Sequence, residues 1–112
     1  MIINTITPVY YPNWIGNRQI YVGTGNGPAS YNATTGDPLS ANFTPFFIDS
    51  VLGPCISVSG NYIVFPQIST SGKGGSWVLY WYAFNKSTGA LSSASAANLS
   101  AEVVQLGVVG GP

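Results

Sequence analysis

The sequence predicts an all-β fold, a small antiparallel β-sandwich or barrel with an extended N-terminal arm and a flexible C-terminal tail. Gly and Pro recur throughout, with 14 glycines and 8 prolines among 112 residues, and they interrupt most stretches long enough for a helix. The apolar segments are rich in Val, Ile, Tyr, Phe and Trp and alternate at period two, as strands do. Short strands and frequent turns in a chain of single-domain length are typical of sandwiches and barrels.

The clearest element is a β-hairpin over residues 55–65. Two alternating runs, 55–59 and 62–65, are separated by Gly60 and Asn61. A Gly-X pair suits the two-residue type I′ or II′ turn that connects antiparallel strands. We therefore expect these two runs to pair.

A second pairing is predicted between residues 76–84 and 90–93, through a turn at 85–89. Residues of the first arm fall into two alternating sets: Trp77, Leu79, Trp81 and Ala83, and Val78, Tyr80, Tyr82 and Phe84. Both sets are apolar or aromatic, whereas a half-buried strand would show one polar face. The strand therefore lies in the middle of a sandwich, or one of its faces contacts another subunit.

One local pattern occurs twice, in residues 31–39 and 84–91. Each segment reads aromatic, Asn, variable, hydroxyl residue, Thr, Gly, and then reaches a leucine. This indicates a duplicated half-domain, a repeated ligand loop, or a common five-residue hairpin turn used twice. The flanking strands do not align, which favours the turn.

The two ends differ from the middle of the chain. Further strands are predicted at 18–22, 46–52 and 101–106. The N-terminal segment is apolar but interrupted by Pro8 and Pro12, which argues against a central strand. The predicted organisation is an extended N-terminal arm at 1–17, a single β domain at 18–106 and a flexible C-terminal tail at 107–112.

Charge is nearly absent, which limits the classes of partner. The chain has 3 basic and 3 acidic residues, and charged residues make up 5% of it, against roughly 25% in typical soluble domains. No field attracts nucleic acid or anionic lipid, and near-zero net charge favours association. The apolar run at 78–84 is far shorter than the roughly 20 residues of a spanning helix. With no signal peptide visible, we expect synthesis in the cytoplasm and no membrane partner.

The residues that carry catalysis are scarce. The chain has no histidine, so Ser-His-Asp and Cys-His triads and the commonest metal ligand are excluded. The acidic residues are Asp37, Asp49 and Glu102, and nothing in their spacing suggests a catalytic pair. Cys55 is the one cysteine and is expected to act as a small buried hydrophobe. We expect no enzymatic activity, no metal and no cofactor.

Aromatic residues are in excess, at 13% of the chain. A strip of Trp77, Tyr80, Trp81 and Tyr82 would offer a platform for stacking on sugar rings. The same residue types are enriched in cores and at protein interfaces. Because few charged side chains are present to bind sugar hydroxyls, core and interface roles are favoured over sugar binding.

In size, composition and layout the chain resembles the small head-decoration, or cement, proteins of tailed bacteriophages. The resemblance is carried by the extended segment through residues 10–12, the turn at 31–39, the hairpin at 56–62 and the stretch 98–102 before a glycine-rich end. It implies a virion protein on the capsid exterior that bridges subunits of the major capsid protein and stabilises the phage head. It also implies a homo-oligomer, with a trimer favoured over a dimer, and no nucleic-acid partner.

The predicted contact residues are aromatic or aliphatic and lie in the arm and in the 76–84 strand: Tyr10, Tyr11, Trp14, Ile15, Trp77, Tyr80, Trp81 and Tyr82. Two other functions stay open. One is a carbohydrate-binding module or a tail or fibre adhesin, which would use the aromatic strip. The other is a head-tail joining subunit, which would form a ring.

Overall fold

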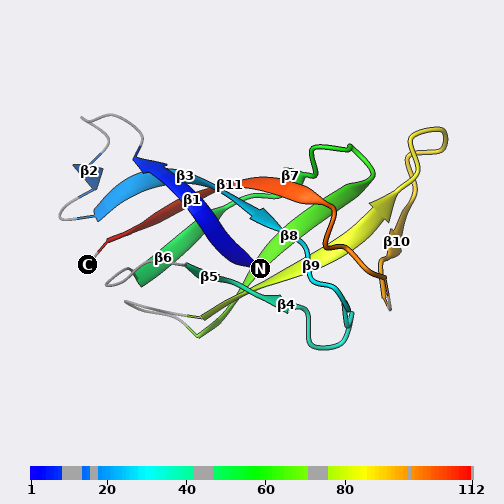
Figure 1. Cartoon of the computed structure of the whole chain (residues 1–112), viewed down its shortest axis with the longest axis horizontal. Helices are drawn as coiled ribbons and strands as arrows, with labels where there is room; N and C mark the ends of the chain where they lie inside the picture. The colour runs from blue at the N-terminus through cyan, green and yellow to red at the C-terminus, as the bar shows by residue number, and fades with distance from the viewer. Residues whose placement is uncertain (9–13, 16–17, 42–46, 71–75, 96, 112) are drawn as a thin grey trace.

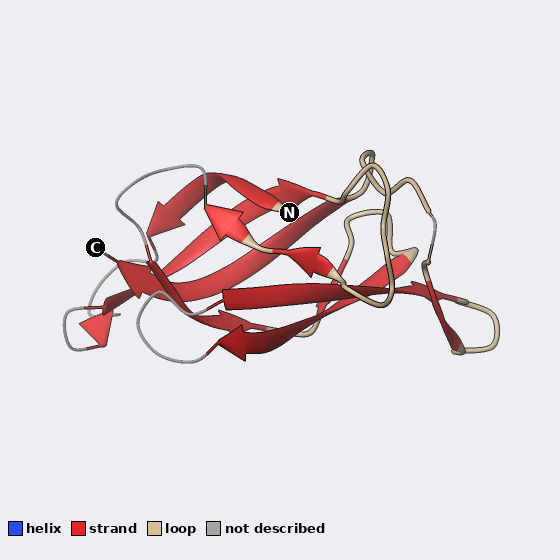
Figure 2. Cartoon of the chain, turned by 90° about the horizontal axis from the view of Figure 1, so that it is seen from below, coloured by secondary structure: helices blue, strands red, loops and turns tan. Residues whose placement is uncertain are grey.

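The structure is a computed structural model that describes residues 1–8, 14–15, 18–41, 47–70, 76–95 and 97–111. Its described elements are all strands (Figures 1 and 2). The first sheet runs in the order β5 (Ser40–Ala41), β1 (Ile2–Pro8), β3 (Arg18–Asn26), β11 (Val103–Gly111) and β6 (Phe47–Leu52), and β2 (Trp14–Ile15) also pairs with β3. The second sheet runs in the order β10 (Leu91–Ser93), β9 (Ser76–Phe84), β8 (Tyr62–Thr70) and β7 (Cys55–Ile56), and β4 (Asp37–Pro38) also pairs with β9.

The two sheets share one core, which confirms the all-β prediction. Fully buried side chains come from both layers: Ile3, Val104, Leu106 and Val108 from the first sheet, and Val64, Leu79 and Trp81 from the second. The pairings are antiparallel apart from β1 with β5. The arrangement is therefore sandwich-like, with the two sheets forming separate layers. No helix within the described residues has the length and hydropathy needed to cross a membrane.

The start of the predicted N-terminal arm belongs to the first sheet. Residues 2–8 form β1, which pairs with β3 on one side and with β5 on the other. Met1 and Ile3 are buried in the core. The two prolines that argued against a strand do not interrupt it, because Pro8 is the last residue of β1 and Pro12 lies beyond it.

The predicted C-terminal tail is also part of the sheet. β11 continues to Gly111 between β3 and β6, and Gly107 through Gly111 pair with residues of β6. A glycine-rich strand fits here because Leu52 lies over Gly107, where an added Cβ would come within 3.1 Å of the Leu52 Cδ1 atom. Residues 2–8 and 107–111 are therefore strand residues of the first sheet.

Both predicted strand pairings are found, but the first turn is not the predicted two-residue turn at Gly60 and Asn61. Residues 57–61 connect β7 to β8, and the Ser57 N–H donates to the Tyr62 carbonyl over 2.9 Å. Cys55 and Ile56 pair with Val64 and Ile63, and Gly60 has a φ of 75° between the two strands. β9 pairs with β10 beyond the 85–89 turn. The first hairpin is more uneven than predicted, since β7 has two residues and β8 has nine.

The repeated pattern is one turn used twice. Gly36 and Gly89 both have a φ of 74°. The Gly36 N–H donates to the Asn32 carbonyl over 2.8 Å, and the Gly89 N–H donates to the Asn85 carbonyl over 2.7 Å. In each turn the asparagine side chain also accepts from the backbone two residues later. This is the Asx-turn chemistry that favours asparagine at such positions.

Candidate functional site

β9 divides its side chains between the core and the outer face of the second sheet. Leu79 and Trp81 are fully buried, whereas Tyr80 and Tyr82 are half-buried on the opposite face. The predicted two-sided strand is therefore found, with one face in the core and the other at the surface of this chain.

This division corrects the predicted aromatic strip. Trp77 and Trp81 lie on the inner side of β9, so they cannot form one platform with Tyr80 and Tyr82. Trp81 was also predicted to contact a partner, but it is inaccessible inside its own domain. Trp77 is half-buried, and its indole N–H has no hydrogen-bond partner among the described residues.

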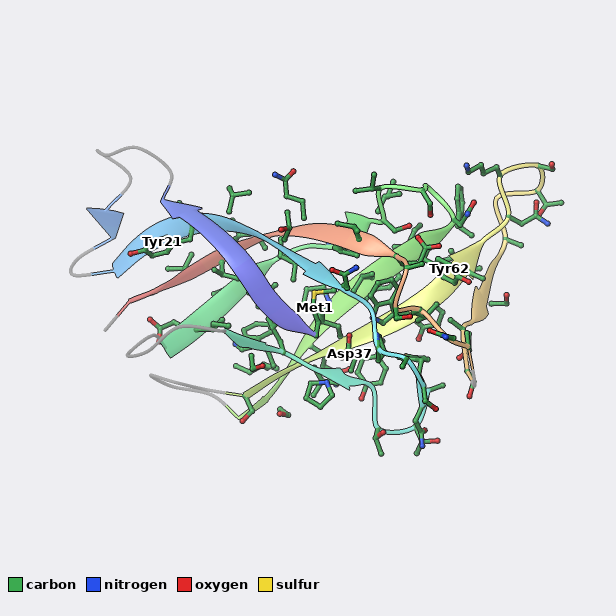
Figure 3. The ribbon with its side chains drawn as sticks, in the orientation of Figure 1. Met1, Tyr21, Asp37 and Tyr62 are labelled. Carbon is green, nitrogen blue, oxygen red and sulfur yellow. The ribbon has the colours of Figure 1, made fainter. Side chains whose placement is uncertain are left out.

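A buried polar cluster anchors β9 to the first sheet. The Trp81 Nε1–H donates to the Asp37 carboxylate over 3.1 Å, and the same carboxylate forms an ion pair with the α-ammonium group of Met1. That ammonium also donates to the Pro38 carbonyl over 2.6 Å. Asp37 is 2% exposed, so these partners supply the charge and donors that a buried carboxylate needs (Figure 3).

Tyr31 completes the hydrogen bonding at the edge of β9. β10 pairs with β9 near Tyr82 and β4 pairs with it at Leu79, and the backbone N–H of Trp81 lies between these two ladders. That N–H donates to the Tyr31 hydroxyl over 3.0 Å. Burial raises the pKa of the Tyr31 phenol above its ordinary value, although the bond from Trp81 opposes the shift.

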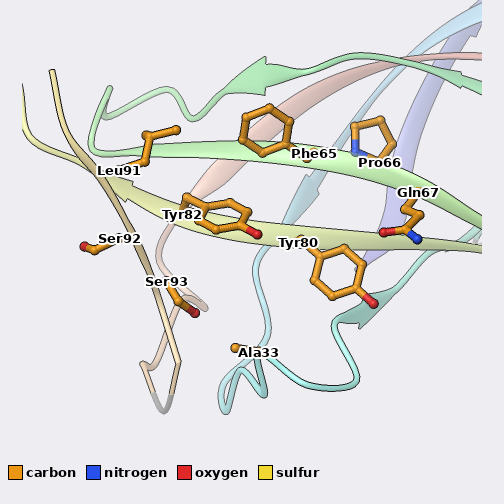
Figure 4. Close-up of a pocket in the computed structure, with 9 residues that line it drawn as sticks. All are labelled: Ala33, Phe65, Pro66, Gln67, Tyr80, Tyr82, Leu91, Ser92 and Ser93. Atoms are coloured by element: carbon orange, nitrogen blue, oxygen red, sulfur yellow. The ribbon is translucent and has the colours of Figure 1, made fainter.

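A groove opens on the outer face of this sheet (Figure 4). Its cavity volume is about 570 Å³, within the range of small-ligand sites. The lining comes from β8, β9, β10 and the first Asx turn: Ala33, Phe65, Pro66, Gln67, Tyr80, Tyr82, Leu91, Ser92 and Ser93. We call this feature the tyrosine groove.

The tyrosine groove combines ring faces with uncharged polar groups. Phe65 and Tyr82 meet edge to face, with ring centroids 5.4 Å apart. Gln67, Ser92 and Ser93 are exposed at its margin. None of the lining residues is charged. The site can therefore stack on an apolar surface and exchange neutral hydrogen bonds with the same ligand.

A second surface feature lies at the end of β6, in β7 and in the turn that follows β7; β6 and β7 are edge strands of the two sheets. Three aliphatic side chains are strongly exposed there: Leu52 at 49%, Ile56 at 61% and Val58 at 77%. We call them the apolar edge. β6 pairs with β11 and β7 pairs with β8, and neither has a second strand partner among the described residues.

Titratable groups are few around these surfaces. Cys55 is half-buried next to the apolar edge, and burial raises the pKa of its thiol, which favours the unreactive protonated form. Glu102 accepts a hydrogen bond from Ser59 over 2.6 Å. Within the described residues, no three His, Cys, Asp or Glu side chains come together as metal ligands would.

The predicted contact residues of the N-terminal segment are only partly placed. Trp14 and Ile15 form β2 and pair with Gln19 and Arg18 of β3. Tyr10 and Tyr11 lie outside the described residues.

Sequence reasoning identified Tyr80 and Tyr82 but missed the rest of the tyrosine groove. Ala33, Ser92 and Ser93 reach it from segments far apart in the chain, and their small side chains carry no binding signal of their own. The apolar edge did leave a signal, because Ile56 and Val58 stand two residues apart in the predicted hairpin. Had residues 55–59 been predicted as a short edge strand, Ile56 and Val58 would have been predicted to be exposed. Comparisons with family models, curated proteins and solved structures found no match to this chain.

Proposed function

We propose that this chain is a non-enzymatic structural subunit that packs its apolar edge against another protein. The observation that carries the proposal is the exposure of Leu52 on β6, Ile56 on β7 and Val58 in the turn that follows β7. Exposed aliphatic side chains on an edge strand invite pairing with another chain, and soluble monomers usually protect such edges with charge or proline.

The chemistry of the apolar edge supports burial in an assembly. Asp49 is the one ionisable side chain of β6, and β7 contributes only the protonated Cys55. Burying one aliphatic side chain of this kind stabilises a complex by about 1.5–3 kcal/mol before ordering costs are subtracted. With so little net charge across the chain, no long-range repulsion opposes contact between copies.

For the setting, we propose a phage capsid, in which the chain decorates the head exterior and bridges neighbouring subunits of the major capsid protein. The resemblance in size, composition and turn layout supports this choice. A rigid sandwich that presents an apolar edge suits a lattice, because repeated weak contacts add through avidity. Trimers are favoured over dimers in this setting.

The proposal is tested by co-sedimentation with empty shells built from the major capsid protein of the genome that carries this gene. We expect saturable binding by the wild-type chain and at least a tenfold loss for Ile56→Lys. Ser30→Lys adds the same charge at another exposed position and is expected to bind as the wild type does.

Two outcomes would contradict parts of the proposal. Absence of shell binding by the wild-type chain would reject the capsid setting. Equal binding by Ile56→Lys and Ser30→Lys would reject the apolar edge as the contact. Deleting residues 1–15 is not a suitable test, because it removes β1 and the buried side chains of Met1 and Ile3.

A further inference from the structure

The geometry points to a second binding site, in which the tyrosine groove holds a neutral carbohydrate. This site is separate from the apolar edge on which the proposed function rests. None of the groove residues belongs to that edge.

The floor of the tyrosine groove suits a flat ligand with an apolar face. Tyr80 and Tyr82 stand two residues apart on β9, which places their Cα atoms about 6.5–7 Å apart along the strand. Phe65 lies opposite Tyr80 on β8 and packs its ring against Tyr82. The C–H groups on one face of a pyranose ring are weakly positive and are attracted to the negative face of such rings.

The margin of the tyrosine groove suits a ligand rich in hydroxyl groups. Ser92 and Ser93 each offer one donor and two acceptor lone pairs, and the Gln67 amide offers both kinds of group. The hydroxyls of Tyr80 and Tyr82 form no hydrogen bond with another described residue. A sugar hydroxyl can donate and accept at the same time, so it can satisfy all of these groups.

Charge decides against other ligand classes. Phosphorylated or sulfated ligands would need Lys or Arg to neutralise their charge, yet none of the lining residues is charged. A proline-rich peptide would also stack on tyrosines, but its proline units offer only carbonyl acceptors. Such a peptide would leave the acceptor groups of Ser92, Ser93 and Gln67 without donors.

The floor comes from β8 and β9, the margin comes from β8 and β10, and the first of the two Asx turns closes one side. Gly36 holds this turn against β9, because an added Cβ would lie 2.2 Å from the Val78 Cγ1 atom. Tyr80 lies beside the same glycine, at 3.2 Å from that Cβ position. The turn therefore fixes both the ring of Tyr80 and the position of Ala33.

The test is an array of neutral oligosaccharides, including glucans, galactans, mannans and chito-oligosaccharides, followed by titration calorimetry with soluble hits. We expect millimolar to micromolar binding by the wild-type chain. Tyr82→Ala is expected to weaken binding at least tenfold. Ser93→Trp, which fills the groove from an exposed position, is expected to abolish it.

Phe84→Ala is the matched control, because Phe84 lies on the same face of the same strand but does not line the groove. It is expected to bind as the wild type does. Absence of binding to every neutral oligosaccharide would overturn the proposal, as would binding to a proline-rich decapeptide alone. Equal loss in Phe84→Ala and Tyr82→Ala would also overturn it. Ile56→Lys should leave oligosaccharide binding unchanged, so the two proposals can fail separately.

Discussion

The tyrosine groove and the apolar edge both involve the second sheet but differ in chemistry. The groove mixes aromatic rings with hydroxyl and amide groups, and its lining comes from the inner strands β8 and β9, the edge strand β10 and the first Asx turn. The apolar edge carries only aliphatic side chains. Leu52 and Ile56 lie on strands with one described strand partner each, and Val58 lies in the turn after β7, where its N–H donates to the Val103 carbonyl over 2.8 Å. A paired strand has its backbone satisfied and offers side-chain chemistry alone, whereas an edge strand also offers free backbone groups.

The comparison suggests why one small domain would carry two kinds of contact. A hollow with a few polar groups selects a small ligand by hydrogen bonding. Exposed aliphatic side chains offer no hydrogen bonds and suit burial against the apolar part of another protein surface. Both depend on the position of β9 and β8 over the first sheet.

The largest expected effect comes from disrupting the buried polar cluster that anchors β9, because both surfaces depend on the position of the second sheet. Asp37→Ala removes the acceptor of the Trp81 indole and leaves the Met1 ammonium without its ion-pair partner. Breaking a buried ion pair costs about 3–5 kcal/mol, a large part of the stability of a small domain. Urea unfolding followed by tryptophan fluorescence should show this loss, and both binding activities should fall together.

Glu102→Ala is the control for this prediction. It removes a carboxylate that is not fully buried and is expected to cost less than about 1 kcal/mol. Equal costs for the two variants would show that the buried cluster contributes little.

The second prediction compares the turn beside the groove with the equivalent turn between β9 and β10. Gly36→Ala and Gly89→Ala change two turns with the same φ of 74°. Both variants should lose about 1–2 kcal/mol for the left-handed conformation. Gly36→Ala should lose about 1–3 kcal/mol more, because its Cβ meets Val78, whereas nothing lies within 4 Å at Gly89. Only Gly36→Ala is expected to weaken oligosaccharide binding. Identical unfolding curves for the two variants would contradict the close packing of the first turn on β9.

The third prediction compares one variant at each surface in the same two binding assays. Ile56→Lys should lose shell binding at least tenfold and keep oligosaccharide binding, and Tyr82→Ala should do the opposite. Both positions are at least partly exposed, so the free energy of unfolding should change by no more than about 1 kcal/mol in either variant. Shell sedimentation and calorimetry on the same two preparations provide the measurement. A variant that loses both activities while remaining folded would show that the surfaces act as one site.

Much of the fold could be predicted because turn chemistry and alternation are local signals. Gly60 with Asn61 marks its hairpin, and the alternation of residues 76–84 gives both faces of β9 correctly. The errors arose at the two ends, where pairing is not local. β1 is a strand because Met1 and Ile3 fill the core beneath it, and β11 accommodates its glycines because β3 and β6 pair on either side.

The candidate sites were less predictable for the same reason. Aromatic content drew attention to Trp77 and Trp81, but the register of β9 turns both inward. Ser93 and Ala33 reach the groove only through pairing and packing between distant segments. Ile56 is exposed because β7 ends after two residues at the sheet edge, a length that the alternating pattern of residues 55–59 did not reveal.

The last prediction concerns the pH dependence of stability and the hydrogen bond between Tyr31 and β9. Burial raises the pKa of Tyr31 in the folded chain above its ordinary value of 10.0. Its contribution to stability is therefore fully present below about pH 10 and is lost as the pH rises from there toward the folded pKa, since the unfolded chain releases the proton first. Tyr31→Phe should remove this part of the alkaline loss. At neutral pH it should cost roughly 1–3 kcal/mol, because the buried Trp81 N–H loses its acceptor. Urea unfolding between pH 7 and pH 11 measures both the cost at neutral pH and the alkaline loss of stability. Parallel pH profiles for the wild type and Tyr31→Phe would contradict the contribution of the Tyr31 phenol to the alkaline loss.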